Sequence, residues 1–215
     1  MFKRIFRLFK IARKLSTSGV IHTVSQVHEI PLPILLFFNC ISIGSDTNRF
    51  SNQNKPGEKL CSALQGMGTT FIKLGQFLAT RPDIIGEEIA NDLERLQDKV
   101  PAFDLYEAKK IIKKEIGEKQ FNNIIELSEP IAAASIAQVH IAKIKNENKE
   151  KNVAVKILRP NIEKLFNEEL DALMLFAYVV ENTISKAKRL KLIEVVLLLR
   201  EITNIEMDLR FEAAA

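Results

Sequence analysis

Lys156 is the residue whose sequence surroundings best fit a chemical role. It lies at the end of the alternating run Val153-Ala154-Val155-Lys156, part of a predicted β-strand over 153–158. One predicted hairpin earlier, the segment 130–135 reads P-I-A-A-A-S and predicts a turn of small residues. Such a loop lets backbone N–H groups approach phosphate oxygens, and a strand-borne lysine supplies neutralising charge. Together they predict half of a nucleotide-binding site.

A lysine in this position needs an acidic partner that orients its amine. Glu212, on the last predicted helix, is the first candidate, and Glu168 and Glu169 are the alternatives. An isolated lysine at a strand end is more often simply solvated. The preceding small-residue loop is what favours the nucleotide interpretation here.

The small-residue loop departs from the glycine-rich loops of kinases. Alanine keeps the small size, but its Cβ restricts φ where glycine would not. The loop is therefore interpreted either as a phosphate cover with altered nucleotide preference or as a tightly packed turn. The residues concerned are Ala132, Ala133, Ala134 and Ser135.

Two other clusters carry polar side chains on predicted helices. Lys73 and Gln76 are i,i+3 neighbours on a predicted helix, and Gly75 between them indicates close approach of another group. Glu206 and Asp208 lie near the end of the chain. Each cluster alone is typical of a solvated helix surface. Brought together with Lys156, they would form an ionic network.

The elements that must position these residues are mostly helical. Asp104 and Glu107 form a capping-box pattern that starts one helix, and Gly117 is a candidate C-cap for it. A strand leaves the alanine turn, and a polar hairpin loop follows at 145–152. The predicted helices cover 58–67, 69–80, 86–98, 104–117, 162–187 and 190–215.

Composition limits the function classes. The chain has 215 residues, 47% of them hydrophobic and 27% charged, which predicts a globular chain with one substantial core. The net charge of +4 is too small to indicate nucleic-acid binding. The three histidines, His22, His28 and His140, are scattered, so no metal site is predicted.

The first fifteen residues predict a basic amphipathic helix. It would lie on an anionic membrane surface or pack as an ordinary surface helix, and the sequence leaves both open. One face carries Phe2, Ile5, Phe6, Phe9 and Ala12, and the other carries Lys3, Arg7, Lys10 and Lys14. The longest apolar run, 30–43, is too short and interrupted to span a bilayer.

Several of these segments, in this order, resemble the UbiB/AarF/ADCK family of atypical protein-kinase-like proteins. Residues 68–83 (G-T-T-F-I-K-L-G-Q-F-L-A-T-R-P-D) resemble its K-x-G-Q helix, and 93–101 (L-E-R-L-Q-D-K-V-P) the segment that follows. Residues 130–140 resemble its alanine-rich loop, 153–160 its lysine strand and 206–214 its E-x-D helix. The resemblance covers roughly 58–215.

The resemblance implies an α+β, mostly helical fold. A helical N-terminal extension would precede a truncated protein-kinase-like N-lobe with a small antiparallel sheet. The implied divisions are a basic segment and loop at 1–57, a helical extension with the K-x-G-Q helix at 58–128, and the partial N-lobe at 129–215.

It also implies roles for the residues singled out above. Ala132 to Ser135 would cover the phosphates of ATP, and Lys156 would contact them while paired with Glu212. Lys73, Gly75 and Gln76 would belong to a regulatory helix that folds over the site, with Glu206 and Asp208 facing it. The implied activity is ATP binding, with slow hydrolysis or small-molecule phosphorylation, in support of ubiquinone (polyprenylphenol) biosynthesis.

One departure from the family is large. The C-lobe motifs that supply a catalytic aspartate and the Mg²⁺ ligands do not occur in this sequence, so Mg²⁺ would need that C-lobe. The expectation is a truncated form, inactive alone, that a separate C-lobe chain would complete. Quinone-biosynthesis proteins are the other implied partners, and the implied location is the bacterial cytoplasm, peripheral to the inner membrane. The alternative is a non-catalytic, membrane-peripheral helical scaffold or a decayed gene fragment.

Overall fold

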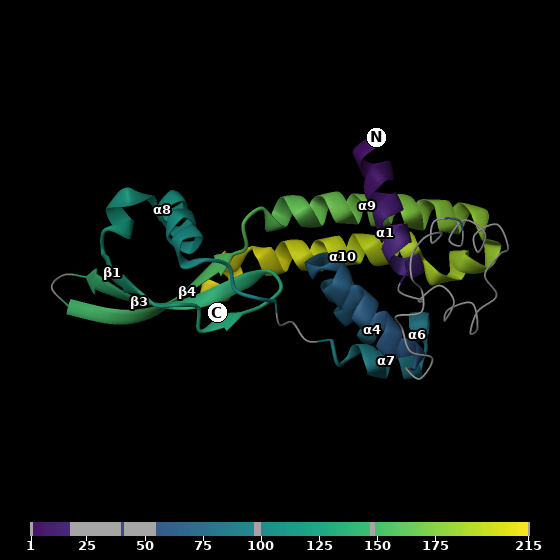
Figure 1. Ribbon diagram of the computed structural model, residues 1–215, viewed down its shortest axis with the longest axis horizontal. Coiled ribbons are helices and arrows are strands. Elements are labelled where there is room, and N and C mark those ends of the chain that lie inside the picture. The colour runs from purple at the N-terminus through teal and green to yellow at the C-terminus, as the bar shows by residue number, and fades with distance from the viewer. Residues whose placement is uncertain (1, 18–39, 41–54, 97–99, 147–148, 215) are drawn as a thin grey trace. The chain divides into compact units, whose positions relative to one another are not determined.

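The computed structural model describes residues 2–17, 40, 55–96, 100–146 and 149–214 (Figure 1). Most of the predicted loop at 45–57 lies outside these residues. The chain forms two compact units, one of Met1–Gln97 with Leu165–Asn204 and the other of Asp98–Lys164 with Ile205–Ala215. The fold is the predicted α+β class, mostly helical with one small antiparallel sheet.

The first unit is helical. Its N-terminal part holds α1 (Phe2–Thr17), α4 (Pro56–Met67), α5 (Thr69–Ala79), α6 (Pro82–Ile85) and α7 (Glu87–Leu93). Its C-terminal part holds most of α9 (Ile162–Thr183), the 3₁₀ helix η2 (Ser185–Leu190) and most of α10 (Leu192–Met207). None of the helices in the described ranges is long and apolar enough to cross a bilayer.

Helix α5 packs closely against α4 and the segment that follows α7, where Gly75 has no side chain. Gly75 of α5 is buried, and a Cβ built there would lie 2.3 Å from Leu96 Cδ1 and 2.8 Å from Leu64 Cδ1. The boundary between α4 and α5 falls at Gly68, whose φ of 107° is readily adopted only by glycine. Both helices were predicted, whereas short α6 was not.

Helices α9 and α10 run side by side, as Figure 1 shows. Arg200 of α10 donates to Asp171 of α9 at 2.9 Å, and the backbone N–H of Ile193 donates to Glu181. Leu170 and Leu199 are almost fully buried in this unit. The sequence predicted helix to residue 187, but α9 ends at Thr183 and the 3₁₀ turn follows.

The second unit holds the sheet, with α8 (Leu105–Phe121) and α11 (Leu209–Ala214). Asp104 is the N-cap of α8, since its side chain accepts a hydrogen bond from Tyr106 N–H. Gly117, expected to end this helix, instead makes a kink at φ 81°, and helix continues to Phe121. The strands are β1 (Ile124–Leu127), β2 (Ala132–Ala133), β3 (Ala137–Asn146) and β4 (Lys149–Leu158).

Strand β3 is the centre of the sheet. Strands β1 and β2 pair with successive stretches of one edge of β3, and β4 pairs antiparallel with its other edge. One face of the sheet packs on α8 in a core of Ala108, Ile112, Leu127, Ala142 and Ile157. The predicted polar loop at 145–152 is wrong in extent, because the ladder continues to the pair Asn146–Lys149.

Candidate functional site

The register of the sheet places the alanine-rich segment and the lysine strand on one face. Ala132 of β2 pairs with Val139 of β3, and Val139 pairs across its other edge with Lys156 of β4. Residues paired across strands direct their side chains to the same face. Because Ala142 and Ile157 face α8, this row lies on the opposite face. Strands are about 4.8 Å apart, so Ala132 and Lys156 are roughly 10 Å apart at Cα.

The amine of Lys156 binds a carboxylate. Its Nζ lies 2.5 Å from Oε2 of Glu212 on α11, and the two side chains are 34% and 61% exposed. The alternative partners have other neighbours, since Glu168 pairs with Arg7 and Glu169 packs beside Thr70. Of the three acidic residues considered from sequence, the structure therefore joins Glu212 to Lys156.

The alanine-rich segment forms the turn of a β-hairpin. Ala132 and Ala133 are in strand β2, and the N–H of Ala134 donates to the carbonyl of Ala137 at 2.8 Å. Ser135 is fully buried, whereas Ala132 is exposed. The segment is therefore a packed turn with one exposed alanine, and its role as a phosphate cover stays a prediction.

The E-x-D segment is not one continuous helix. Helix α10 ends at Met207, Asp208 caps the following helix by accepting from Arg210 N–H, and α11 begins at Leu209. Asp208 also accepts two hydrogen bonds from the Arg210 guanidinium, which holds the pKa of this carboxyl below its usual value. Glu206 is exposed near the end of α10. The predicted single helix over 190–215 is wrong here, because aspartate is a strong N-cap residue.

The K-x-G-Q residues lie on α5 in the first unit. Lys73 and Gln76 are half-buried, and Gly75 between them is buried against Leu64 and Leu96. The close approach inferred from Gly75 is therefore a contact with side chains of the neighbouring helical segments. The approach of Lys73 and Gln76 to Glu206 and Asp208 stays a prediction.

Sequence reasoning missed a polar network under the alanine turn. The side-chain amide of buried Gln138 binds both the N–H and the carbonyl of Phe103, and its Nε2 lies 2.9 Å from His140 Nε2. His140 Nδ1 lies 2.8 Å from the carbonyl oxygen of Ser128. The signal was the i,i+2 spacing of Gln138 and His140, which places two polar side chains on one strand face.

Arg159 was also missed. It follows β4 directly, and its guanidinium binds the carbonyl oxygens of Ala134, Val100 and Pro101 at 2.8–3.0 Å. Its position three residues after Lys156, just before Pro160, was the available signal. A planar guanidinium with five donors can bridge several carbonyls in this way.

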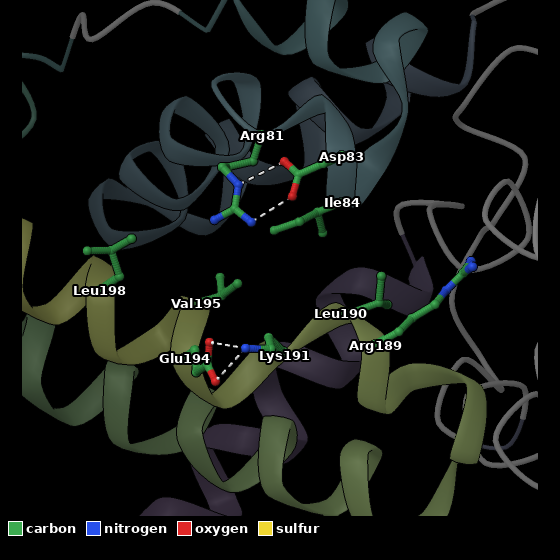
Figure 2. Close-up of a pocket in the computed structure, with 9 residues that line it drawn as sticks. All are labelled: Arg81, Asp83, Ile84, Arg189, Leu190, Lys191, Glu194, Val195 and Leu198. Atoms are coloured by element: carbon green, nitrogen blue, oxygen red, sulfur yellow. Dashed lines mark hydrogen bonds and ion pairs between the residues drawn. The ribbon is translucent and has the colours of Figure 1, made fainter.

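A cavity of about 240 Å³ lies within the first unit. Figure 2 shows its charged walls, where Arg81 binds Asp83 on one side and Lys191 binds Glu194 on the other. Apolar side chains, among them Val195, lie between these pairs. Arg81 and Lys191 thus each have an acidic neighbour within the cavity wall. Nowhere in the described ranges do three or more His, Cys, Asp or Glu residues gather as metal ligands would.

Comparison with known proteins defines the class. The family model described as the ABC1 atypical kinase-like domain matches residues 95–215, and the chain belongs to this family. The chain is 37% identical over 213 residues to a protein of Marinobacter nauticus named Probable protein kinase UbiB. Proteins with the same name from Pseudomonas paraeruginosa and Pseudomonas aeruginosa are each 41% identical over 159 residues. The resemblance to the UbiB/AarF/ADCK family is confirmed.

These relatives are much longer than the chain. The Marinobacter alignment covers 98% of this chain but 38% of the relative. Each of the two Pseudomonas alignments covers 74% of this chain and 29% of the relative. No solved structure matches the chain significantly.

Proposed function

We propose that this chain supplies the ATP-binding half of a UbiB-type atypical kinase or ATPase that supports ubiquinone biosynthesis. In this proposal the alanine-rich turn, Ala132 to Ser135, covers the phosphates. Lys156 contacts them and Glu212 orients its amine. A C-lobe, in the same or a separate chain, would add the Mg²⁺ ligands and the catalytic aspartate. Proteins of quinone biosynthesis would be its further partners.

The row Ala132, Val139 and Lys156 carries the proposal. The cation of Lys156 and the exposed Ala132 lie on one face of the sheet, and only Val139 lies between them in this row. Lys156 is about one-third exposed, so an anion can reach its amine without unfolding the strand. Its ammonium has three donors, so it can bind a phosphate oxygen while keeping Glu212.

The residues therefore fit a triphosphate chemically. A phosphate oxygen on Lys156 would gain a charge-assisted hydrogen bond, which is roughly twice as strong as a neutral one. When bound, ATP would supply the phosphoryl group. The residues of this chain would hold it and shield its charge.

Titration with a fluorescent ATP analogue tests the proposal. Lys156→Ala should raise the Kd by about tenfold or more, because one hydrogen bond to a charged group contributes about 1.5–3 kcal/mol. Lys151→Ala, which removes an exposed lysine from the same strand, is the control and should change Kd less than twofold. Equal affinity of the wild type and Lys156→Ala would refute the proposed site.

We also propose that α1 contacts an anionic bilayer. Ile11 and Ala12 are buried within the first unit. Arg7 binds Glu168, and Lys14 binds the carbonyl of Gly66. The apolar face predicted from sequence is thus divided, because Ala12 packs inward. The exposed stripe consists of Phe6, Phe9, Lys10 and Arg13, at i, i+3, i+4 and i+7.

This stripe supports membrane contact because it joins aromatic rings to cations on one helix face. Co-sedimentation should be stronger with phosphatidylglycerol vesicles than with phosphatidylcholine vesicles. The double variant Phe6→Ala and Phe9→Ala should lose most of that binding, since each phenylalanine offers a large apolar area. Equal sedimentation with both vesicle types would contradict the contact.

A further inference from the structure

Arg159 binds two backbone carbonyl groups of the alanine turn. The backbone N–H of Arg159 donates to the carbonyl of Ile136 at 2.9 Å, and its Nε and Nη2 donate to the carbonyl of Ala134 at 2.9 and 2.8 Å. The turn between β2 and β3 is thus bound on both sides of Ser135. Hydrogen bonds from a guanidinium are charge-assisted, so they resist thermal opening better than neutral bonds.

The same guanidinium holds a second segment. Its Nη1 donates to the carbonyl of Pro101 and its Nη2 to the carbonyl of Val100, at 2.9 and 3.0 Å. The neighbouring Phe103 is fastened separately, because Gln138 accepts from its N–H and donates to its carbonyl. Residues 100–103 therefore form a strap tied to the alanine hairpin at two points.

The hydrogen-bond donors and acceptors of buried Gln138 and His140 can be assigned in only one way. Gln138 Nε2 has two hydrogens and lies within bonding distance of the carbonyl of Phe103 and of His140 Nε2. His140 Nε2 must then accept, and its Nδ1 donates to the carbonyl of Ser128. Gln138 and His140 are 1% and 0% exposed, so water cannot replace these partners. The Gln138 amide is thereby fixed in the orientation that binds Phe103.

Arg159 also orients one peptide group of the turn. In a trans peptide the C=O and the following N–H point in opposite directions. Two donors on the Ala134 carbonyl therefore direct the N–H of Ser135 away from the guanidinium. Amide orientation is what determines whether a small-residue loop can donate to phosphate oxygens.

We propose that Arg159 is a positioning residue for nucleotide binding, which fastens strap 100–103 to the alanine turn and sets the direction of its amides. This inference rests on the proposed ATP-binding function. Lysine at this position would keep the charge but lose the planar fork that spans three carbonyls. The geometry, rather than the charge alone, is the property that the proposal assigns to Arg159.

Amide hydrogen exchange on the full chain tests the clamp without nucleotide. Arg159→Lys should speed exchange of the Ala134 and Phe103 amides by about tenfold, as expected for loss of one charge-assisted bond. The control is Arg95→Lys, since Arg95 is 70% exposed and lies 3.8 Å from Glu58. It should leave both exchange rates unchanged. Unchanged rates in Arg159→Lys would overturn the clamp.

The second readout is affinity for the fluorescent ATP analogue. Arg159→Lys should raise Kd by about tenfold while its urea midpoint stays close to that of Arg95→Lys. Faster exchange with an unchanged Kd would overturn the link to nucleotide binding. If even the wild type does not bind the analogue, the proposed function fails, and the exchange rates alone then decide whether the clamp exists.

Discussion

Lys156 and Glu212 are 56 residues apart in the chain, and the structure joins them at 2.5 Å between Nζ and Oε2. Each is positioned by a different local rule. The ladder of β3 and β4 fixes Lys156 opposite Val139. The cap at Asp208 starts α11, and Glu212 lies one turn into it. A continuous helix through Asp208 would carry Glu212 in another direction, so the capping aspartate helps to position the carboxylate.

The Lys156–Glu212 pair should add little to stability. Both side chains are partly exposed, and pairs of this kind typically contribute about 0–1 kcal/mol. A double-mutant cycle of Lys156→Ala and Glu212→Gln, followed by urea unfolding, should give a coupling energy below about 1 kcal/mol. A coupling of several kcal/mol would mean that the pair mainly stabilises the fold, contrary to its proposed binding role.

Gly75 and Gly66 should respond differently to substitution by alanine. Both are in helices, where alanine is favoured over glycine by about 0.5–1 kcal/mol. A Cβ at Gly66 meets nothing within 4 Å, whereas one at Gly75 lies 2.3 Å from Leu96 Cδ1. Gly66→Ala should therefore raise the urea midpoint, and Gly75→Ala should not.

A larger side chain sharpens this comparison. Gly75→Val should destabilise the chain by about 1–3 kcal/mol, the usual cost of overpacking. Gly66→Val should cost less than about 1 kcal/mol, which reflects only the lower helix propensity of valine. Similar urea midpoints for the two valine variants would show that α5 is not closely packed at Gly75.

Local sequence signals predicted the presence of helices and strands better than the positions of their ends. The cap at Asp104 and the strand at 153–158 depend on neighbouring residues, and both are present. The hairpin was predicted too short because residues 145–152 are polar. Backbone pairing needs no apolar side chains, and Lys143 and Glu150 even bind each other across the strands at 2.5 Å.

The partner of Lys156 could not be found from local signals. Glu168, Glu169 and Glu212 carry the same carboxylate, so the sequence could rank Glu212 first but could not exclude the other two. Tertiary packing determines which carboxylate pairs with Lys156, because Glu168 binds Arg7 and Glu169 is largely buried. Arg159 was overlooked for a related reason, since its partners are backbone carbonyls that every residue possesses.

The N-cap of α8 gives a third prediction. Asp104 Oδ1 accepts from the N–H of Tyr106 at 2.6 Å, so Asp104→Ala should destabilise the chain by about 1 kcal/mol. Glu107, predicted to complete a capping box, lies instead 3.7 Å from Lys110 Nζ. Glu107→Ala should therefore cost less than about 0.5 kcal/mol. Equal shifts of the urea midpoint would mean that Glu107 also contributes to the cap.

Glu169 should make stability depend on pH. Burial raises the pKa of this carboxyl, and nearby Thr70, Arg7, Lys14 and Lys10 oppose the increase only in part. Glu169 Oε2 is buried without a hydrogen-bond partner in the described part of the chain, which disfavours the charged form. The folded chain thus holds this proton more tightly than the unfolded chain, whose glutamate pKa is about 4.3.

The sign of the effect follows from this difference. The stabilising contribution of protonated Glu169 is fully present below about pH 4.3 and is lost as pH rises through the higher folded pKa. Glu169→Gln removes the ionisation, so its free energy of unfolding relative to the wild type should increase from pH 4 to neutral pH. Urea unfolding of both proteins at each pH measures this difference, and most other titrations cancel.

Glu168→Gln is the matched control at the adjacent position. Glu168 binds Arg7 and its side chain is 35% exposed, so its charge should be neutral or favourable to folding. Its substitution should leave stability unchanged or reduce it at neutral pH, opposite to Glu169→Gln. If Glu169→Gln is less stable than the wild type at pH 7, the attraction of Arg7, Lys10 and Lys14 outweighs burial, and the direction inferred for its pKa is wrong.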